Sequence, residues 1–82
     1  MATLKDIYAV CSRLDILTEF RGASAEFMTE FSGLRKAAYA AVMEEQGIDD
    51  PDRAAALPED TVLGEKAQTA LEGLKGLLPQ QK

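Results

Sequence analysis

Few side chains in this sequence could perform chemistry. It has no histidine and a single cysteine, Cys11. Cys11 falls between Ile7 and Leu14 on an apolar stripe, where a free thiol behaves as a small hydrophobic residue and not as a nucleophile. One thiol excludes an internal disulfide, and the histidine and cysteine ligands of a zinc site are missing. The sequence therefore predicts a protein that is not an enzyme and that needs no metal or other cofactor.

One group of basic and aromatic residues could hold an anion. Arg35 and Tyr39 are four residues apart and share a helix face, Lys36 lies beside them, and Arg21 precedes their segment. Such a group could bind a phosphate while stacking on a ring. Alternatively, Arg35 covers apolar surface with its charge in water, and Tyr39 packs at the edge of the core. The first interpretation gives one alternative function, an oligomeric protein that binds or sequesters a nucleotide-like anion between subunits.

A second group of residues is strongly acidic. Residues 44–60 contain seven carboxylates and one arginine, a net charge of −6. A surface of this kind attracts a basic patch on a partner protein. The predicted partner-binding residues are Glu44, Glu45, Asp49, Asp50 and Asp52. Two other interpretations stay open, since acids in such a run also cap helices in solvent, and an acidic surface could mimic nucleic acid in an inhibitor of viral type.

Composition limits the class of protein further. The 82 residues allow one domain, 1–82, with a net charge of −5 and a hydrophobic fraction of 46%. The negative charge argues against direct binding of nucleic acid. No apolar run approaches the roughly 18 residues of a membrane span, and no signal peptide is evident, so we expect a cytoplasmic protein without membrane contact. A chain this short buries about 60 to 65% of its unfolded surface, which favours support from self-association.

The spacing of apolar residues predicts helices that would position these groups. A first helix is expected from Thr3 to Arg21, begun by a capping box of Thr3 and Asp6. A second is expected from Ser24 to Gln46, where Ser24 is the N-cap and Gly47 supplies the left-handed residue at the end. Short connections between such helices favour antiparallel packing.

The rest of the chain predicts two further elements. A short helical turn is expected from Asp52 to Leu57 and a last helix from Glu59 to Leu78. Gly64, Gly73 and Gly76 weaken the last helix but let another backbone approach it closely. We therefore expect it to pack tightly on the alanine-rich second helix, in an all-α, compact bundle of three main helices with a short helical turn before the last.

The predicted function follows from these surfaces. A set of apolar residues forms either the core or an oligomer face: Leu4, Ile7, Cys11, Leu14, Phe27, Phe31 and Leu34. We expect a non-enzymatic protein-protein interaction module that forms a homo-oligomer. It would bind another protein, one with a basic surface, through an acidic or apolar helical surface.

Overall fold

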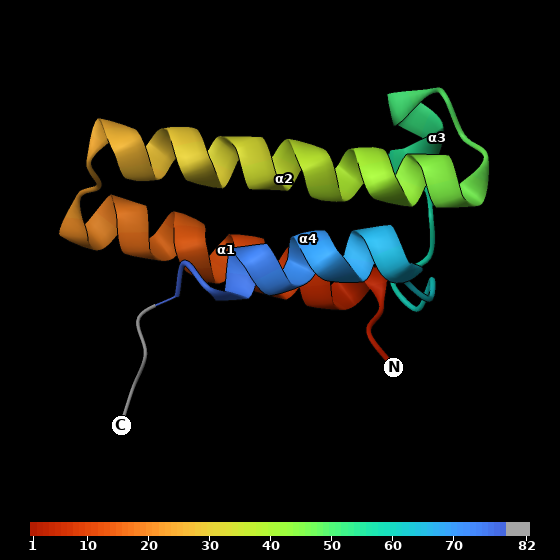
Figure 1. Cartoon of the computed structure of the whole chain (residues 1–82), viewed down its shortest axis with the longest axis horizontal. Coiled ribbons are helices and arrows are strands. Elements are labelled where there is room, and N and C mark those ends of the chain that lie inside the picture. Colours follow the sequence, from red (N-terminus) through yellow and green to blue (C-terminus); the bar gives the residue numbers. More distant parts are fainter. Residues whose placement is uncertain (79–82) are drawn as a thin grey trace.

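The computed structural model describes residues 1–78, and for Phe20 and Arg21 it describes the backbone alone. Within these residues there are four helices, α1 (Leu4–Arg21), α2 (Ala25–Gln46), α3 (Pro51–Ala55) and α4 (Glu65–Lys75). Helices α1 and α2 form an antiparallel hairpin, and α4 runs back along α2 in the direction of α1 (Figure 1). This arrangement confirms the predicted all-α bundle with a short helical element before the last helix. None of the described helices is both long and apolar enough to cross a membrane.

Local signals begin α1 and α2 where the sequence predicts. The N–H of Thr3 donates to Asp6 Oδ2 at 2.8 Å, which is the return bond of a capping box. At the start of α2, Ser24 Oγ accepts from the N–H of Phe27 at 3.1 Å. Each bond satisfies an N–H group at a helix start and so fixes the residue at which the helix begins.

The end of α2 and the start of α3 are also locally determined. Gly47 is left-handed with φ 67°, and the N–H of Ile48 donates to the carbonyl of Met43 at 2.9 Å. This is the six-to-one bond of a Schellman motif, as predicted. Asp50 Oδ1 then accepts from the N–H of Asp52 at 3.0 Å and caps α3, whose first residue is a proline.

The predicted last helix is wrong at both ends, because α4 begins at Glu65 and ends at Lys75. The preceding residues form a turn and an isolated bridge to the N-terminal segment. The N–H of Leu4 donates to the carbonyl of Thr61 at 2.9 Å, and the N–H of Lys5 donates to that of Glu59 at 2.9 Å. The carbonyls of Glu59 and Thr61 accept hydrogen bonds from the first turn of α1, so they do not accept the hydrogen bonds of a helix that starts at Glu59. This competing demand comes from residues far away in the sequence.

Helix α4 approaches α2 more closely than it approaches α1. Small residues make this possible, since Ala38 of α2 and Ala67 of α4 are both fully buried. A Cβ atom added at Gly73 would lie 3.0 Å from Leu34 Cδ2, so this glycine lets the leucine pack against α4. The tight packing of these two helices was predicted from their alanines and glycines.

The core lies between the three longer helices. Its buried side chains are Leu4, Ile7, Val10, Cys11, Leu14, Phe31, Ala38, Ala41, Val42, Leu63, Ala67, Leu71 and Leu74. Most of the apolar set predicted as core or oligomer face is therefore core, while Phe27 and Leu34 are half-buried at its edge.

Helix α4 covers one side of the α1–α2 hairpin. It has 11 residues against 18 in α1 and 22 in α2, and in Figure 1 it lies in front of α1. On α2, Leu34 and Glu44 meet α4, whereas Arg35 and Tyr39 meet α1 on the opposite flank. We call the side of the hairpin away from α4 the open face. Helical spacing assigns it the following residues: Tyr8, Ser12, Asp15 and Glu19 of α1, and Met28, Ser32, Arg35 and Tyr39 of α2.

Candidate functional site

An ion pair between α1 and α2 lies at the centre of the open face. Arg35 Nη2 donates to Asp15 Oδ1 at 2.7 Å. The guanidinium carbon of Arg35 also lies 4.2 Å from the centroid of the Phe31 ring, within the range of a cation–π contact. Phe31 is buried, whereas both charged side chains are partly exposed. Arg35 therefore covers the aromatic core with its Nε buried, while its Nη2 pairs with Asp15 at the surface.

We call the line of contact between α1 and α2 on the open face the seam. Two tyrosines, Tyr8 and Tyr39, continue it toward α3. The ring centroids of Tyr8 and Tyr39 are 6.2 Å apart with the planes tilted by 39°, a separation typical of interacting aromatic pairs. Both rings are half-buried. Burial raises the pKa of Tyr39, and the neighbouring Cys11 raises it further. The phenol therefore stays neutral at physiological pH and offers its ring and hydroxyl as contact surface.

Cys11 lies in the core beneath this seam with 6% of its surface exposed. Burial raises the pKa of its thiol, the charge of Arg35 lowers it, and Asp15 raises it again, with a net upward shift. A thiol with a raised pKa carries little thiolate at neutral pH and is a poor nucleophile. Cys11 thus acts as a packing residue, which agrees with its place on the apolar stripe.

A pocket of about 390 Å³ lies where α3 approaches the hairpin. Its lining residues are Leu4, Tyr8, Tyr39, Val42, Met43, Pro51, Ala54 and Ala55. This volume is within the range of roughly 300 to 1,000 Å³ that binding pockets occupy. Among the described residues, no charged side chain lines it. The pocket therefore suits an apolar or aromatic group better than an anion.

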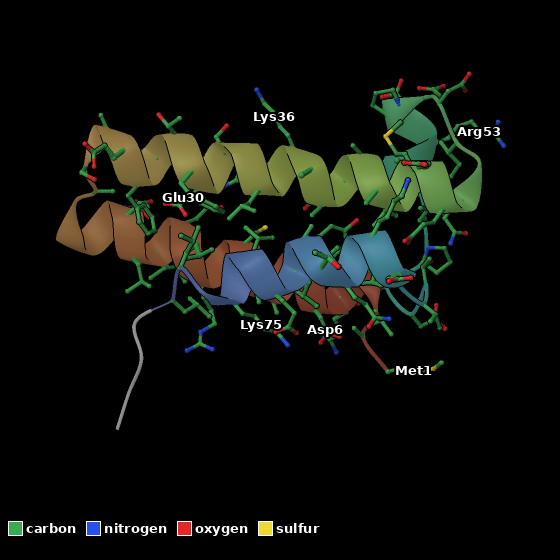
Figure 2. All side chains as sticks on the ribbon, in the orientation of Figure 1. Met1, Asp6, Glu30, Lys36, Arg53 and Lys75 are labelled. Atoms are coloured by element: carbon green, nitrogen blue, oxygen red, sulfur yellow. The ribbon has the colours of Figure 1, made fainter. Side chains whose placement is uncertain are left out.

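The predicted anion-binding residues are only partly brought together. Arg35 and Tyr39 lie on the open face, where Asp15 already pairs with the arginine. Lys36 points away from α1 and α4 at the outer edge of α2 (Figure 2). The side chain of Arg21 lies outside the described part of the structure. Among the described residues of this group, only Arg35 brings a positive charge to the seam, and it is paired with Asp15.

Of the predicted partner-binding acids, Glu45 has a clear role within the chain. Its Oε1 accepts from the N–H of Gly64 at 2.8 Å, and its Oε2 accepts from the N–H of Ala67 at 3.2 Å. These N–H groups belong to the N-cap and first turn of α4, where a negative charge is also favoured by the helix dipole. Glu45 therefore caps α4 from the end of α2.

The other acids of this group divide into two kinds. Glu44 forms an exposed ion pair with Lys66, with a distance of 2.6 Å between Oε1 and Nζ, and Asp50 caps α3. The ion pair raises the pKa of Lys66 through its hydrogen bond and charge interaction with Glu44. Asp49 and Asp52 are exposed. Three of the five predicted acids thus contact their own chain.

Known proteins add no further constraint, because no family model, curated protein or solved structure matches this chain. The described residues also contain no group of three or more histidine, cysteine, aspartate or glutamate side chains that could hold a metal ion.

Sequence reasoning missed two members of the seam, Asp15 and Tyr8. Their spacing of seven residues on α1 matches a helical face, but their partners on α2 lie at least 20 residues away in the sequence.

Proposed function

We propose that this chain is a non-enzymatic helical interaction module that self-associates and binds protein through its open face. The observation that carries this proposal is that α4 covers one side of the hairpin and leaves apolar and aromatic groups accessible on the other. Met28 is 44% exposed on this face, Ile16 is 53% exposed at its border, and Tyr8 and Tyr39 are half-buried. The open pocket adds apolar surface beside the tyrosines.

Burial of this surface would stabilise both an interface and the fold. Removing apolar surface from water contributes roughly 25 cal/mol per Å², and a chain this short has a small core of its own. Exposed apolar groups that gather on one face, bordered by polar residues, are typical of protein interfaces. The polar residues Ser12 and Ser32 and the Asp15–Arg35 pair provide hydrogen-bonding groups on the same surface.

The intramolecular contacts of the acidic segment favour the apolar surface over the acidic one. Glu45 and Asp50 cap helices, and Glu44 pairs with Lys66. Their charges are already partly satisfied, which lowers what a basic partner would gain from them. Asp49 and Asp52 would add long-range attraction to a basic partner without forming the contact surface.

The proposal that the module is not an enzyme is supported by its ionisable groups. The sequence has no histidine, and its one thiol has a pKa raised by burial. Acid-base or nucleophilic catalysis requires a group whose pKa and exposure suit the reaction. The seam between α1 and α2 offers an ion pair and two phenols, which are more suitable for binding.

Sedimentation velocity over a wide range of protein concentration tests the proposal. We expect an oligomer that dissociates on dilution and that Met28→Asp weakens, because the substitution places a charge in the apolar contact. Thr69→Asp is the matched control, since it adds the same charge at an exposed position of α4, on the other side of the hairpin. A mass of 8.9 kDa at every concentration would contradict self-association.

A further inference from the structure

We propose that two copies of this chain pack open face to open face about a two-fold axis parallel to α1 and α2, so that Arg35 of each copy faces Asp15 of the other. This inference rests on the proposed self-association and specifies its interface. The occupant of the open face is thus a second copy of the same chain. The argument depends on how the residues of the hairpin are matched across its seam.

Residues of α1 and α2 that share a level along the hairpin are complementary to one another. Asp15 and Arg35 form an ion pair of 2.7 Å, and Tyr8 and Tyr39 have ring centroids 6.2 Å apart. Both pairs are partly exposed, so each can also contact a group placed above it. A surface whose left and right halves complement each other at these two levels also complements, at the same levels, a copy of itself in which left and right are exchanged.

A two-fold axis along the seam makes this exchange. Rotation about an axis parallel to the helices keeps each level and places α1 of one copy over α2 of the other. Asp15 then meets the second copy's Arg35, and Tyr8 meets its Tyr39. Such an interface is isologous, because the same contact occurs twice.

Charge selects this axis over the perpendicular one. An axis that crosses the helices at the level of the ion pair would place α2 over α2, and Arg35 would face Arg35. At the same separation, like charges repel as strongly as opposite charges attract, and like charges across an interface cost several kcal/mol. With the axis along the seam, the four charges alternate in sign around the centre of the interface.

The exposed apolar groups of the open face take separate places in this arrangement. Ile16 follows Asp15 directly on α1, so it is level with the ion pair and lies beside the charge cluster. Met28 lies about two helical turns from Arg35 toward the hairpin turn, where its flexible side chain can adapt to the second copy. At the opposite end, the pocket lined by Tyr8, Tyr39 and residues of α3 provides further apolar surface.

The size of the face is sufficient for a stable dimer. The molecule is flat, with extents of 36 × 26 × 18 Å. A standard interface buries about 800 Å² on each partner, which a broad side of these dimensions can supply. The two hairpins would form a four-helix bundle with α4 of each copy on the outside.

Charge reversal tests the crosswise pairing. We expect Asp15→Arg and Arg35→Asp each to raise the dissociation constant by about tenfold or more, because each places like charges both across and within the chains. The double variant Asp15→Arg/Arg35→Asp restores every opposite-charge contact and is expected to bring the constant back toward that of the wild type. If both single variants weaken the dimer and the double variant does not restore it, the crosswise pairing is wrong.

A second pair of variants does not involve the ion pair. Ser12→Arg places a long side chain on the open face, whereas Thr69→Arg places the same side chain on the exposed surface of α4. We expect the first to abolish the dimer and the second to leave it unchanged, with circular dichroism showing that both remain helical. A wild-type oligomer that Ser12→Arg and Asp15→Arg leave intact would overturn this interface but not self-association, whereas a wild-type monomer would overturn both.

Discussion

Glu45 couples the ends of two helices through one carboxylate. It accepts hydrogen bonds from Gly64 and Ala67, whose N–H groups have no partner within α4. We expect Glu45→Ala to lower the free energy of unfolding by about 1 to 2 kcal/mol, the usual cost of losing a helix cap. Urea denaturation measures this change. The variant Glu45→Gln keeps one acceptor oxygen, so its free energy of unfolding should fall between those of the wild type and Glu45→Ala.

The neighbouring Glu44 provides the matched control. Its ion pair with Lys66 is exposed on both sides, and exposed pairs contribute about 0 to 1 kcal/mol. Glu44→Ala should therefore cost clearly less than Glu45→Ala. Equal losses in the two variants would show that net charge, and not the cap, determines their effect.

The buried thiol of Cys11 and the half-buried phenol of Tyr39 predict how stability depends on pH. The pKa of Cys11 is raised above its ordinary value of 9.0, and that of Tyr39 above 10.0, mainly by burial. The folded chain therefore keeps these protons at pH values where the unfolded chain has lost them, so stability is complete below about pH 9 and decreases as the pH rises further. Urea unfolding from neutral to alkaline pH should show a shallower decrease for Cys11→Ala and for Tyr39→Phe. Slopes equal to that of the wild type would contradict this assignment, whatever the absolute stabilities of the variants.

At the scale of elements, two helix-interior glycines should respond differently to alanine. A Cβ at Gly33 of α2 meets nothing within 4 Å, whereas one at Gly73 of α4 would lie 3.0 Å from Leu34 Cδ2. Gly33→Ala should raise the free energy of unfolding by about 0.5 to 1 kcal/mol, the helix propensity gain. Gly73→Ala should gain less or become destabilising, since Leu34 must move. Thermal melts of both variants decide the matter, and an equal gain would mean that α2 and α4 are not in close contact there.

The elements also show which features a sequence can reveal. Helices α1 and α2 were predicted because their ends depend on neighbours such as Ser24 and Gly47. The start of α4 was not, because the carbonyls of Glu59 and Thr61 bond to the first turn of α1. The cap from Glu45 and the pairing of Arg35 with α1 likewise join residues about 20 positions apart. Local sequence patterns carry no information about such contacts. The basic and acidic groups were therefore found from the sequence, but the residues that they contact in the fold were not.

At the scale of the whole molecule, the bundle is asymmetric in how it covers its hairpin. Helix α4 and the segment before it complete the core on one side, and Leu63, Ala67, Leu71 and Leu74 are buried there. On the open face, α3 approaches only the end near Tyr8 and Tyr39, and the centre of the face carries an ion pair where a core would have apolar groups. The three longer helices thus fold around one core and leave exposed the surface that a second hairpin would cover in the proposed dimer.

The proposed dimer would couple folding to association, which predicts that thermal stability depends on protein concentration. A partner that binds only the folded chain stabilises it by mass action, and for a dimer each tenfold rise in concentration above the dissociation constant adds about 0.7 kcal/mol per chain. For a domain of this length, that corresponds to a rise in Tm of roughly 3 to 5 °C. Scanning calorimetry of the wild type at increasing concentration should show this rise, while Ser12→Arg, with its open face blocked, should melt at one temperature throughout. A wild-type Tm independent of concentration would mean that the open face is not buried in the folded state, because association and folding would then not be linked.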